Sequence, residues 1–161
     1  NYYSTNSRLR EAQRKVLKIP KTGMAITLDI GEKYDIHPSN KHDVGYRLAR
    51  FALKNDYNKD ITVSGPLYKN IFINEDIIKV FFSYNDNGLV LDQGENSEFE
   101  IAGADKNFIQ ANVVNQGEYL EVFSEKVLRP KYVRYAWSDT STATLFNAAG
   151  LPASSFSSED E

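Results

Sequence analysis

The chain has 161 residues, 41% of them hydrophobic and 12% aromatic, which is enough to bury one core or two small ones and excludes a disordered or fibrous protein. Its formal net charge is -3 and its basic residues are spread among acids, so no nucleic-acid partner is expected. No apolar run approaches the roughly 20 residues that span a bilayer, no basic-then-apolar leader opens the sequence, and the lack of cysteine excludes disulfides and thiolate metal sites.

The first expected element is an amphipathic helix near the start of the chain. Its apolar residues recur at the spacing of one helical face: Leu9, Ala12 and Val16. Asn6 or Ser7 is available as the N-cap of this helix, and Pro20 is available to end it.

A strand, a loop and a second helix are expected next. Residues 22–28 form a nearly continuous apolar run, which is typical of a strand buried on both faces of a parallel sheet. Pro38 and Ser39 interrupt the chain after it. Apolar residues then return on one helical stripe: Val44, Leu48, Phe51 and Ala52. Helix, buried strand, loop and helix form the last step of an α/β domain, here over residues 1–56. Since one strand cannot make a sheet, we expect its exposed edge near Met24 to associate with another polypeptide.

The pattern changes near residue 57, where short β-type runs begin. They are 61–63, 71–73, 77–84, 99–101, 108–114, 119–123 and 132–137. The segments 85–88, 92–96 and 115–118 carry the Asn, Asp and Gly residues that hairpin turns use. Regular short strands with such turns predict an antiparallel β-sandwich domain over residues 57–153. Residues 154–161 are small, polar and acidic, which predicts a flexible tail.

The loop after the predicted strand carries the candidate catalytic residues. A histidine and nearby acids, placed between an apolar strand and a helix, are the usual setting for the acid-histidine pair of a hydrolase. We expect His37 to be the general base and Asp35 to orient it, with Asp29 as the alternative acid. Pro38 restricts His37 to an extended backbone, which aims its side chain out of the loop. His42, at the exposed side of the helix start, is expected to have no role.

Several short sequence motifs resemble those of a known family. In the first part they are residues 9–13, 22–25, 29–31, 35–38 (Asp-Ile-His-Pro), 40–41 and 44–49, and together they resemble the end of the catalytic domain of sialate O-acetylesterases. In the second part they are residues 64–68, 99–105, 133–137 and 147–153, which resemble the β-rich segment that closes those proteins. The similarity spans nearly the whole chain.

The resemblance implies an SGNH-type serine esterase that removes acetyl groups from O-acetylated sialic acids, with no metal or organic cofactor. The nucleophile of that family lies upstream in a Gly-Gln-Ser-like turn, which this sequence lacks. The resemblance also implies that the chain is the C-terminal portion of an exported enzyme (periplasmic, extracellular or lysosomal). Without the N-terminal portion that carries the serine, we expect it to be inactive or nearly so. In the common SGNH pattern the acid precedes the histidine by three residues. Here that position holds Tyr34, and Asp35 lies two residues before His37.

Other interpretations stay open. An acetylxylan esterase of the same fold would use the same chemistry with a different sugar pocket. A carbohydrate-binding or interaction β-sandwich module would use residues 1–56 only as a helical collar. Tyr68, Arg134 and Trp137 could form a platform facing an acidic sugar, although packing in the core is the more usual role for Trp137.

Overall fold

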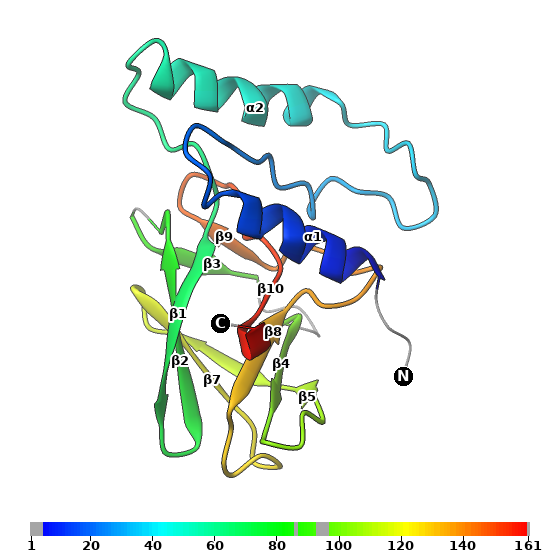
Figure 1. The fold of residues 1–161 in the computed structure, drawn as a ribbon, viewed down its shortest axis with the longest axis vertical. Helices are drawn as coiled ribbons and strands as arrows, with labels where there is room; N and C mark the ends of the chain where they lie inside the picture. The colour runs from blue at the N-terminus through cyan, green and yellow to red at the C-terminus, as the bar shows by residue number, and fades with distance from the viewer. Residues whose placement is uncertain (1–4, 86, 93–96, 161) are drawn as a thin grey trace.

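The computed structural model describes residues 5–85, 87–92 and 97–160, and it has an α+β fold with antiparallel sheets, as the sequence predicts (Figure 1). The helices are α1 (Thr5–Val16) and α2 (His42–Asn55). The strands are β1 (Leu67–Asn74), β2 (Ile77–Ser83), β3 (Leu89–Leu91), β4 (Phe99–Ala102), β5 (Ile109–Gln110), β6 (Asn112–Asn115), β7 (Tyr119–Phe123), β8 (Tyr132–Tyr135), β9 (Leu145–Asn147) and β10 (Phe156–Ser157), followed by the short 3-10 helix η1 (Ser158–Asp160). Neither α1 nor α2 has the length and apolar content needed to cross a bilayer.

Helix α1 forms near the start of the chain, as the sequence predicts, but Asn6 and Ser7 lie inside it rather than capping it, and it buries the opposite face. The buried residues are Ser7, Glu11 and Arg14. Arg14 donates two hydrogen bonds to the Glu11 carboxylate, at 2.9 and 2.8 Å, and its guanidinium lies 5.3 Å from the centre of the Tyr68 ring. Leu9 and Val16 of the predicted apolar stripe are 58% and 48% exposed. The helix therefore contacts the β-rich part through a paired polar face and leaves its apolar stripe uncovered by the described residues.

The strand predicted over residues 22–28 is absent, and this prediction is wrong for the chain alone. The segment is irregular, and within the described part of the chain none of its backbone N–H groups donates a hydrogen bond. Three of its carbonyl groups accept hydrogen bonds. Ile26 O accepts from Arg47, Thr27 O accepts from the amides of Ile30 and Gly31 at 3.2 and 3.1 Å, and Leu28 O accepts from the amide of Ala143 at 3.3 Å. A strand is defined by a partner strand, and the strands that the structure describes all lie after residue 66 and pair with one another.

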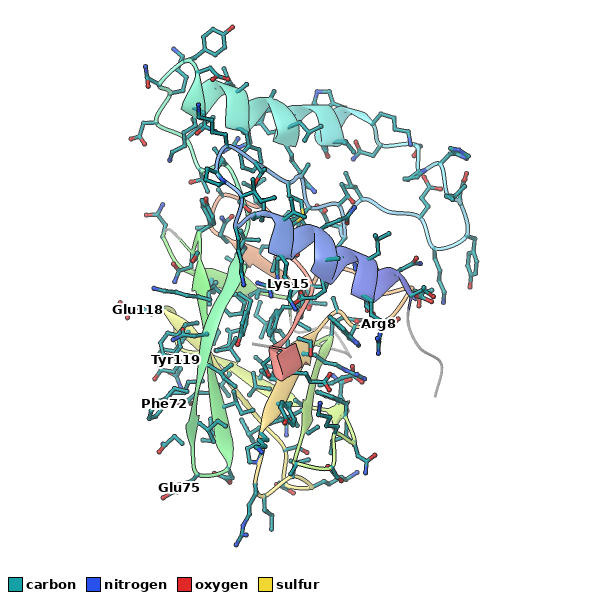
Figure 2. All side chains as sticks on the ribbon, viewed as in Figure 1. Arg8, Lys15, Phe72, Glu75, Glu118 and Tyr119 are labelled. Carbon is teal, nitrogen blue, oxygen red and sulfur yellow. The ribbon has the colours of Figure 1, made fainter. Side chains whose placement is uncertain are left out.

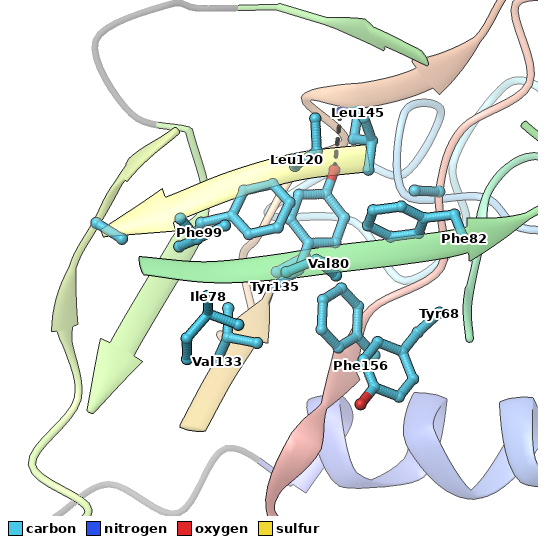
Figure 3. Close-up of a cluster of buried hydrophobic side chains, with 14 of the residues drawn as sticks. Tyr68, Ile78, Val80, Phe82, Phe99, Leu120, Val133, Tyr135, Leu145 and Phe156 are labelled. Atoms are coloured by element: carbon cyan, nitrogen blue, oxygen red, sulfur yellow. Dashed lines mark hydrogen bonds between the residues drawn. The ribbon is translucent and has the colours of Figure 1, made fainter. Parts of the chain in front are cut away.

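Two four-stranded antiparallel sheets make up most of the β-rich part. Their strand orders are β1-β2-β7-β6 and β10-β8-β4-β5, while β3 pairs with β9. The fully buried side chains of the two sheets meet in one core (Figure 3). Those from the first sheet include Ile78, Val80, Leu120 and Val122, and those from the second include Phe99, Ile101, Val133 and Tyr135. Because side chains alternate between the two faces of a strand, one face of each sheet packs in this core and the other face points outward. Figure 2 shows Phe72 and Tyr119 on the outward side of the first sheet.

The C-terminal segment belongs to this core, which corrects the expected flexible tail. Phe156 in β10 pairs with Tyr135 of β8 and is fully buried. Its ring centre lies 4.5 Å from that of Tyr68 and 6.2 Å from that of Tyr135. Ser154 and Ser155 are also buried. Composition misled the prediction because small serines can line a buried strand once hydrogen bonds satisfy them.

Most of the expected β-runs become strands, with changed limits. The run 61–63 is not a strand, and the run 108–114 is interrupted at Ala111, which separates β5 from β6. The segment 115–118 is a hairpin turn between β6 and β7, with Gly117 at φ 87°. The segment 85–88 leads instead to β3, which pairs with β9, and Asp86 lies outside the described residues. Most of the predicted turn 92–96 also lies outside them.

Candidate active site

The loop that carries His37 is held closed by a carboxylate at its base. Glu32 Oε1 accepts hydrogen bonds from both the backbone N–H and the hydroxyl of Ser39, at 2.7 and 2.9 Å. The backbone of Glu32 also forms an isolated antiparallel bridge with that of Asp35. These contacts join the two ends of residues 32–39, so the short segment around His37 is a closed loop. In Figure 1 it is the light-blue loop on the right, beyond the N-terminal end of α2.

Within this loop, the structure brings His37 and Asp35 together loosely. Asp35 Oδ1 accepts a hydrogen bond from the backbone N–H of His37 at 2.8 Å. The same oxygen lies 4.0 Å from His37 Nδ1, beyond hydrogen-bond distance. The two side chains are 84% and 56% exposed. The carboxylate thus lies on the Nδ1 side of the imidazole, where an orienting acid would lie, but it is bonded to the backbone and not to the ring.

Asp29, the alternative acid, is engaged elsewhere. Its two carboxylate oxygens accept hydrogen bonds from the guanidinium of Arg47 in α2, at 2.7 and 2.5 Å. Arg47 is buried and also donates to the carbonyl of Ile26. A two-bond pair of this kind is among the strongest polar contacts in proteins. It links α2 to the segment that enters the loop, so Asp29 has a structural partner and Asp35 is the carboxylate beside His37.

A second histidine-carboxylate pair lies at the start of α2, where no role was expected for His42. His42 Nδ1 is 3.1 Å from Asp43 Oδ1, and the His42 ring stacks near that of Tyr46 with a centre distance of 6.4 Å. The pKa of Asp43 is lowered by hydrogen bonds from the Asn40 side chain and then from His42. This pair is geometrically tighter than that of His37 and Asp35. Neighbouring residues at a helix start meet readily, however, and the Asn40 amide already occupies the other oxygen of Asp43.

A nucleophile is not placed beside either histidine. Among the residues that the structure describes, no hydroxyl group is hydrogen-bonded to the side chain of His37 or His42. The nearest loop serine, Ser39, donates its hydroxyl hydrogen to Glu32. Within the same ranges, no group of three or more His, Asp or Glu side chains is arranged to hold a metal ion. Among the described residues, the loop therefore presents a histidine and a neighbouring carboxylate, with no hydroxyl group bonded to the histidine ring.

An open cleft of about 580 Å³ lies next to the base of the loop. Its walls are the end of α1 with Leu17 just after it, the irregular segment 22–28, the loop 139–142 and residues 154–155. Glu32 and Lys33, at the start of the His37 loop, reach its margin. Sequence reasoning could not locate this cleft, because its walls come from four separate parts of the chain.

The supposed sugar platform of Tyr68, Arg134 and Trp137 is not assembled. Tyr68 is 7% exposed and stacks on Phe156 in the core. Arg134 pairs with Glu100, with Nε 2.7 Å from Oε2, and its guanidinium covers the Phe108 ring at 4.0 Å. Trp137 is half-buried. Two of the three side chains are thus committed to contacts within the chain.

No protein-family model matches the sequence, and no curated protein matches it either. Among solved structures, however, the chain is similar to part of a carbohydrate acetylesterase. That protein is XAC1771 from Xanthomonas citri, described as a novel carbohydrate acetylesterase, with 36% sequence identity and a TM-score of 0.90. The match covers 98% of this chain and 37% of that one, so the chain spans 37% of the length of the esterase. The similarity is therefore to a part of that esterase.

Proposed function

We propose that this chain is the C-terminal part of a carbohydrate O-acetylesterase and supplies the histidine and acid of its active site. The observation that carries the proposal is the match to the acetylesterase over 98% of the chain at 36% identity. Helices α1 and α2 and the loop of His37 lie within the part that is matched. A binding module would have no need of a closed loop that places an acid beside a histidine.

The proposed reaction is ester cleavage through an acetyl-enzyme. A serine from the rest of an SGNH-type catalytic domain attacks the acetyl carbonyl, and His37 accepts the hydroxyl proton. The bond from the carbonyl carbon to the sugar oxygen then breaks, and His37 returns its proton to that oxygen. Water attacks the acetyl-serine with His37 again as base, releasing acetate and the free serine. Asp35 stabilises the positive charge that His37 carries between these steps.

The N-terminal part of the same enzyme is the partner that this proposal requires. Support for its docking site comes from the uncovered elements around the cleft. The segment 22–28 is apolar and its N–H groups have no acceptor within the described residues. The apolar stripes on either side are open, with Leu9 58% and Leu48 51% exposed. Unpaired backbone flanked by apolar helix faces is what an edge of a helix-covered sheet presents before its neighbouring strand is added.

The proposed substrates are O-acetylated sialic acids, on the basis of the short sequence motifs that resemble those of sialate O-acetylesterases. An acetylated xylan is the alternative, since the chemistry at the ester would be the same. We further propose that the enzyme is exported, to a periplasmic, extracellular or lysosomal location, on the basis of the same resemblance.

The test replaces each histidine in the complete enzyme and measures acetate release from an acetylated sugar. His37→Ala should lower kcat by about 10²- to 10⁴-fold, the usual contribution of a general base. His42→Ala is the matched control, because His42 is equally exposed and has the closer carboxylate. It should leave the rate unchanged. Full activity of His37→Ala, or loss of activity only in His42→Ala, would contradict the proposed role of this loop.

A further inference from the structure

Tyr34 and Ile36 are displayed to solvent on the same loop as His37. Tyr34 is 91% exposed and Ile36 is 89% exposed, the highest values among the large hydrophobic residues that the structure describes. A single exposed apolar side chain needs no explanation. Two of them, one on each side of Asp35 and within three residues of the candidate base, form a local apolar surface at the site.

The loop holds these side chains outward rather than letting them collapse onto the protein. Glu32 fastens the far end of the loop through the two hydrogen bonds from Ser39. Asp35 accepts the N–H of His37, which fixes the backbone directly after Ile36. Pro38 further restricts the residue before it. With the backbone restrained on both sides, the exposed display of Tyr34 and Ile36 is part of the loop conformation.

The chemistry of the displayed groups fits a sugar. Lys33 Nζ lies 5.3 Å from the centre of the Tyr34 ring, so an aromatic face, a phenol hydroxyl and an ammonium group occur together. A pyranose offers apolar C–H faces for stacking on an aromatic ring and hydroxyl groups for hydrogen bonds at its edge. The acetyl methyl group is apolar and small, which suits contact with Ile36. Acidic and basic groups alternate here as Glu32, Lys33 and Asp35, so the surface is not selective for one charge.

We propose that Tyr34 is a specificity-determining residue that stacks on the sugar ring of the acetylated substrate and holds the ester beside His37. This inference rests on the proposed function and names the element of that site that binds the sugar. A contact of Tyr34 with the rest of the enzyme is the competing explanation of its exposure. The position of Tyr34 within three residues of the candidate base favours the sugar.

The experiment compares two esters in the complete enzyme. One is the O-acetylated sugar that the enzyme hydrolyses, tested as an acetylated sialic acid and as an acetylated xylo-oligosaccharide. The other is ethyl acetate, which has the ester but no ring to stack. Tyr34→Ala should raise KM for the sugar ester by about 5- to 10-fold, the size of one aromatic stacking contact, with little change in kcat and none for ethyl acetate. Tyr34→Phe keeps the ring and should retain most of the sugar affinity.

Tyr57→Ala is the matched control, because Tyr57 is also strongly exposed, at 69%, but lies after α2 and away from the loop. It should leave both substrates unchanged. An unaltered KM of Tyr34→Ala for the sugar ester would overturn the inference. So would an equal loss on both esters together with a lower Tm, which would show that Tyr34 contacts protein instead. Failure of the proposed function is separate, since it would appear as full activity of His37→Ala.

Discussion

Arg47 and Asp29 form a two-bond ion pair that ties helix α2 to the chain just ahead of the His37 loop. The distances are 2.7 Å from Nη1 to Oδ1 and 2.5 Å from Nη2 to Oδ2, and Nη1 also donates to the carbonyl of Ile26. The side chains are only 9% and 18% exposed. One guanidinium thus fixes both a carboxylate and a carbonyl of an otherwise irregular segment. The entry to the loop is therefore set by α2.

Removing Arg47 should destabilise the chain more than removing another cation of α2. Arg47→Met leaves the Asp29 carboxylate and the Ile26 carbonyl unpaired in a largely buried place, and we expect a loss of about 2–3 kcal/mol of unfolding free energy. Lys54→Met is the control, because Lys54 is exposed and makes one long bond of 3.3 Å to Ile61 O. It should change stability by about 0.5 kcal/mol or less. Urea unfolding measures both. Equal effects of the two changes would show that the Asp29 pair contributes nothing specific.

The hydroxyl of Tyr135 should make a measurable contribution within the core. It accepts the backbone N–H groups of Thr144 and Leu145, at 2.8 and 3.0 Å, and the residue is fully buried. Tyr135→Phe leaves both donors without this acceptor, and we expect a cost of about 1–3 kcal/mol. Thermal or urea unfolding at neutral pH checks this value. An unchanged stability would mean that the two N–H groups find water or another acceptor.

Tyr135 should also make stability fall at alkaline pH. Burial raises the pKa of this phenol above its ordinary value, chiefly by desolvation of the phenolate. Above the unfolded pKa of about 10, the unfolded chain loses the proton while the folded chain keeps it, so the unfolding free energy decreases as pH rises. The contribution is fully present below that pKa. Comparing urea unfolding at pH 8 and pH 11 should show a smaller decrease for Tyr135→Phe than for the unaltered chain. The opposite order would contradict the assignment.

The C-terminal strand should be essential to the core despite its polar composition. Phe156→Ala removes a fully buried ring that contacts those of Tyr68 and Tyr135, and we expect a loss of about 3–5 kcal/mol. Phe72→Ala is the control at the same residue type, because Phe72 is 59% exposed on the outward face of β1 (Figure 2). It should cost less than about 1 kcal/mol. Limited proteolysis and urea unfolding distinguish the two. A stable Phe156→Ala protein would restore the idea of a loosely attached tail.

Local patterns predicted the elements whose partners lie in this chain. The turn at 115–118 and the β-type run 119–123 are local signals, and the structure has a hairpin turn and strand β7 there. The segment 22–28 has an equally clear apolar signal but no partner strand among the described residues, so periodicity alone predicted a state that the chain by itself does not adopt. The prediction for the segment around Phe156 was wrong in the opposite sense, because a flexible tail was expected and the structure has a buried strand. A single buried aromatic in a serine-rich segment gives no periodic signal, and its place depends on pairing with β8.

The candidate site could be predicted only in part, because contacts between residues that are distant in the sequence leave no local pattern. The sequence placed His37 and Asp35 in one loop, and the structure puts them near each other there. The sequence alone could not decide between Asp29 and Asp35 as the acid. That choice depends on Arg47, which binds Asp29 and lies eighteen residues after it. The clamp between Glu32 and Ser39 was also missed, because a carboxylate and a serine seven residues apart have no pattern until the loop closes.

Two glycines offer a final matched pair of predictions. A Cβ at Gly65 would lie 1.9 Å from the carbonyl oxygen of Pro152 and 2.6 Å from that of Leu151, both backbone atoms that cannot move aside without displacing the end of the β9 region. Gly65→Ala should therefore destabilise the chain by about 2 kcal/mol or more, through forced displacement of packed backbone. Gly45 lies inside α2, and a Cβ there would meet no atom within 4 Å. Gly45→Ala should instead stabilise the chain by about 0.5–1 kcal/mol, because alanine loses less backbone freedom in a helix. Opposite shifts of the urea midpoint are the expected result. A harmless Gly65→Ala would mean that the contact between residues 65 and 152 is not maintained in solution.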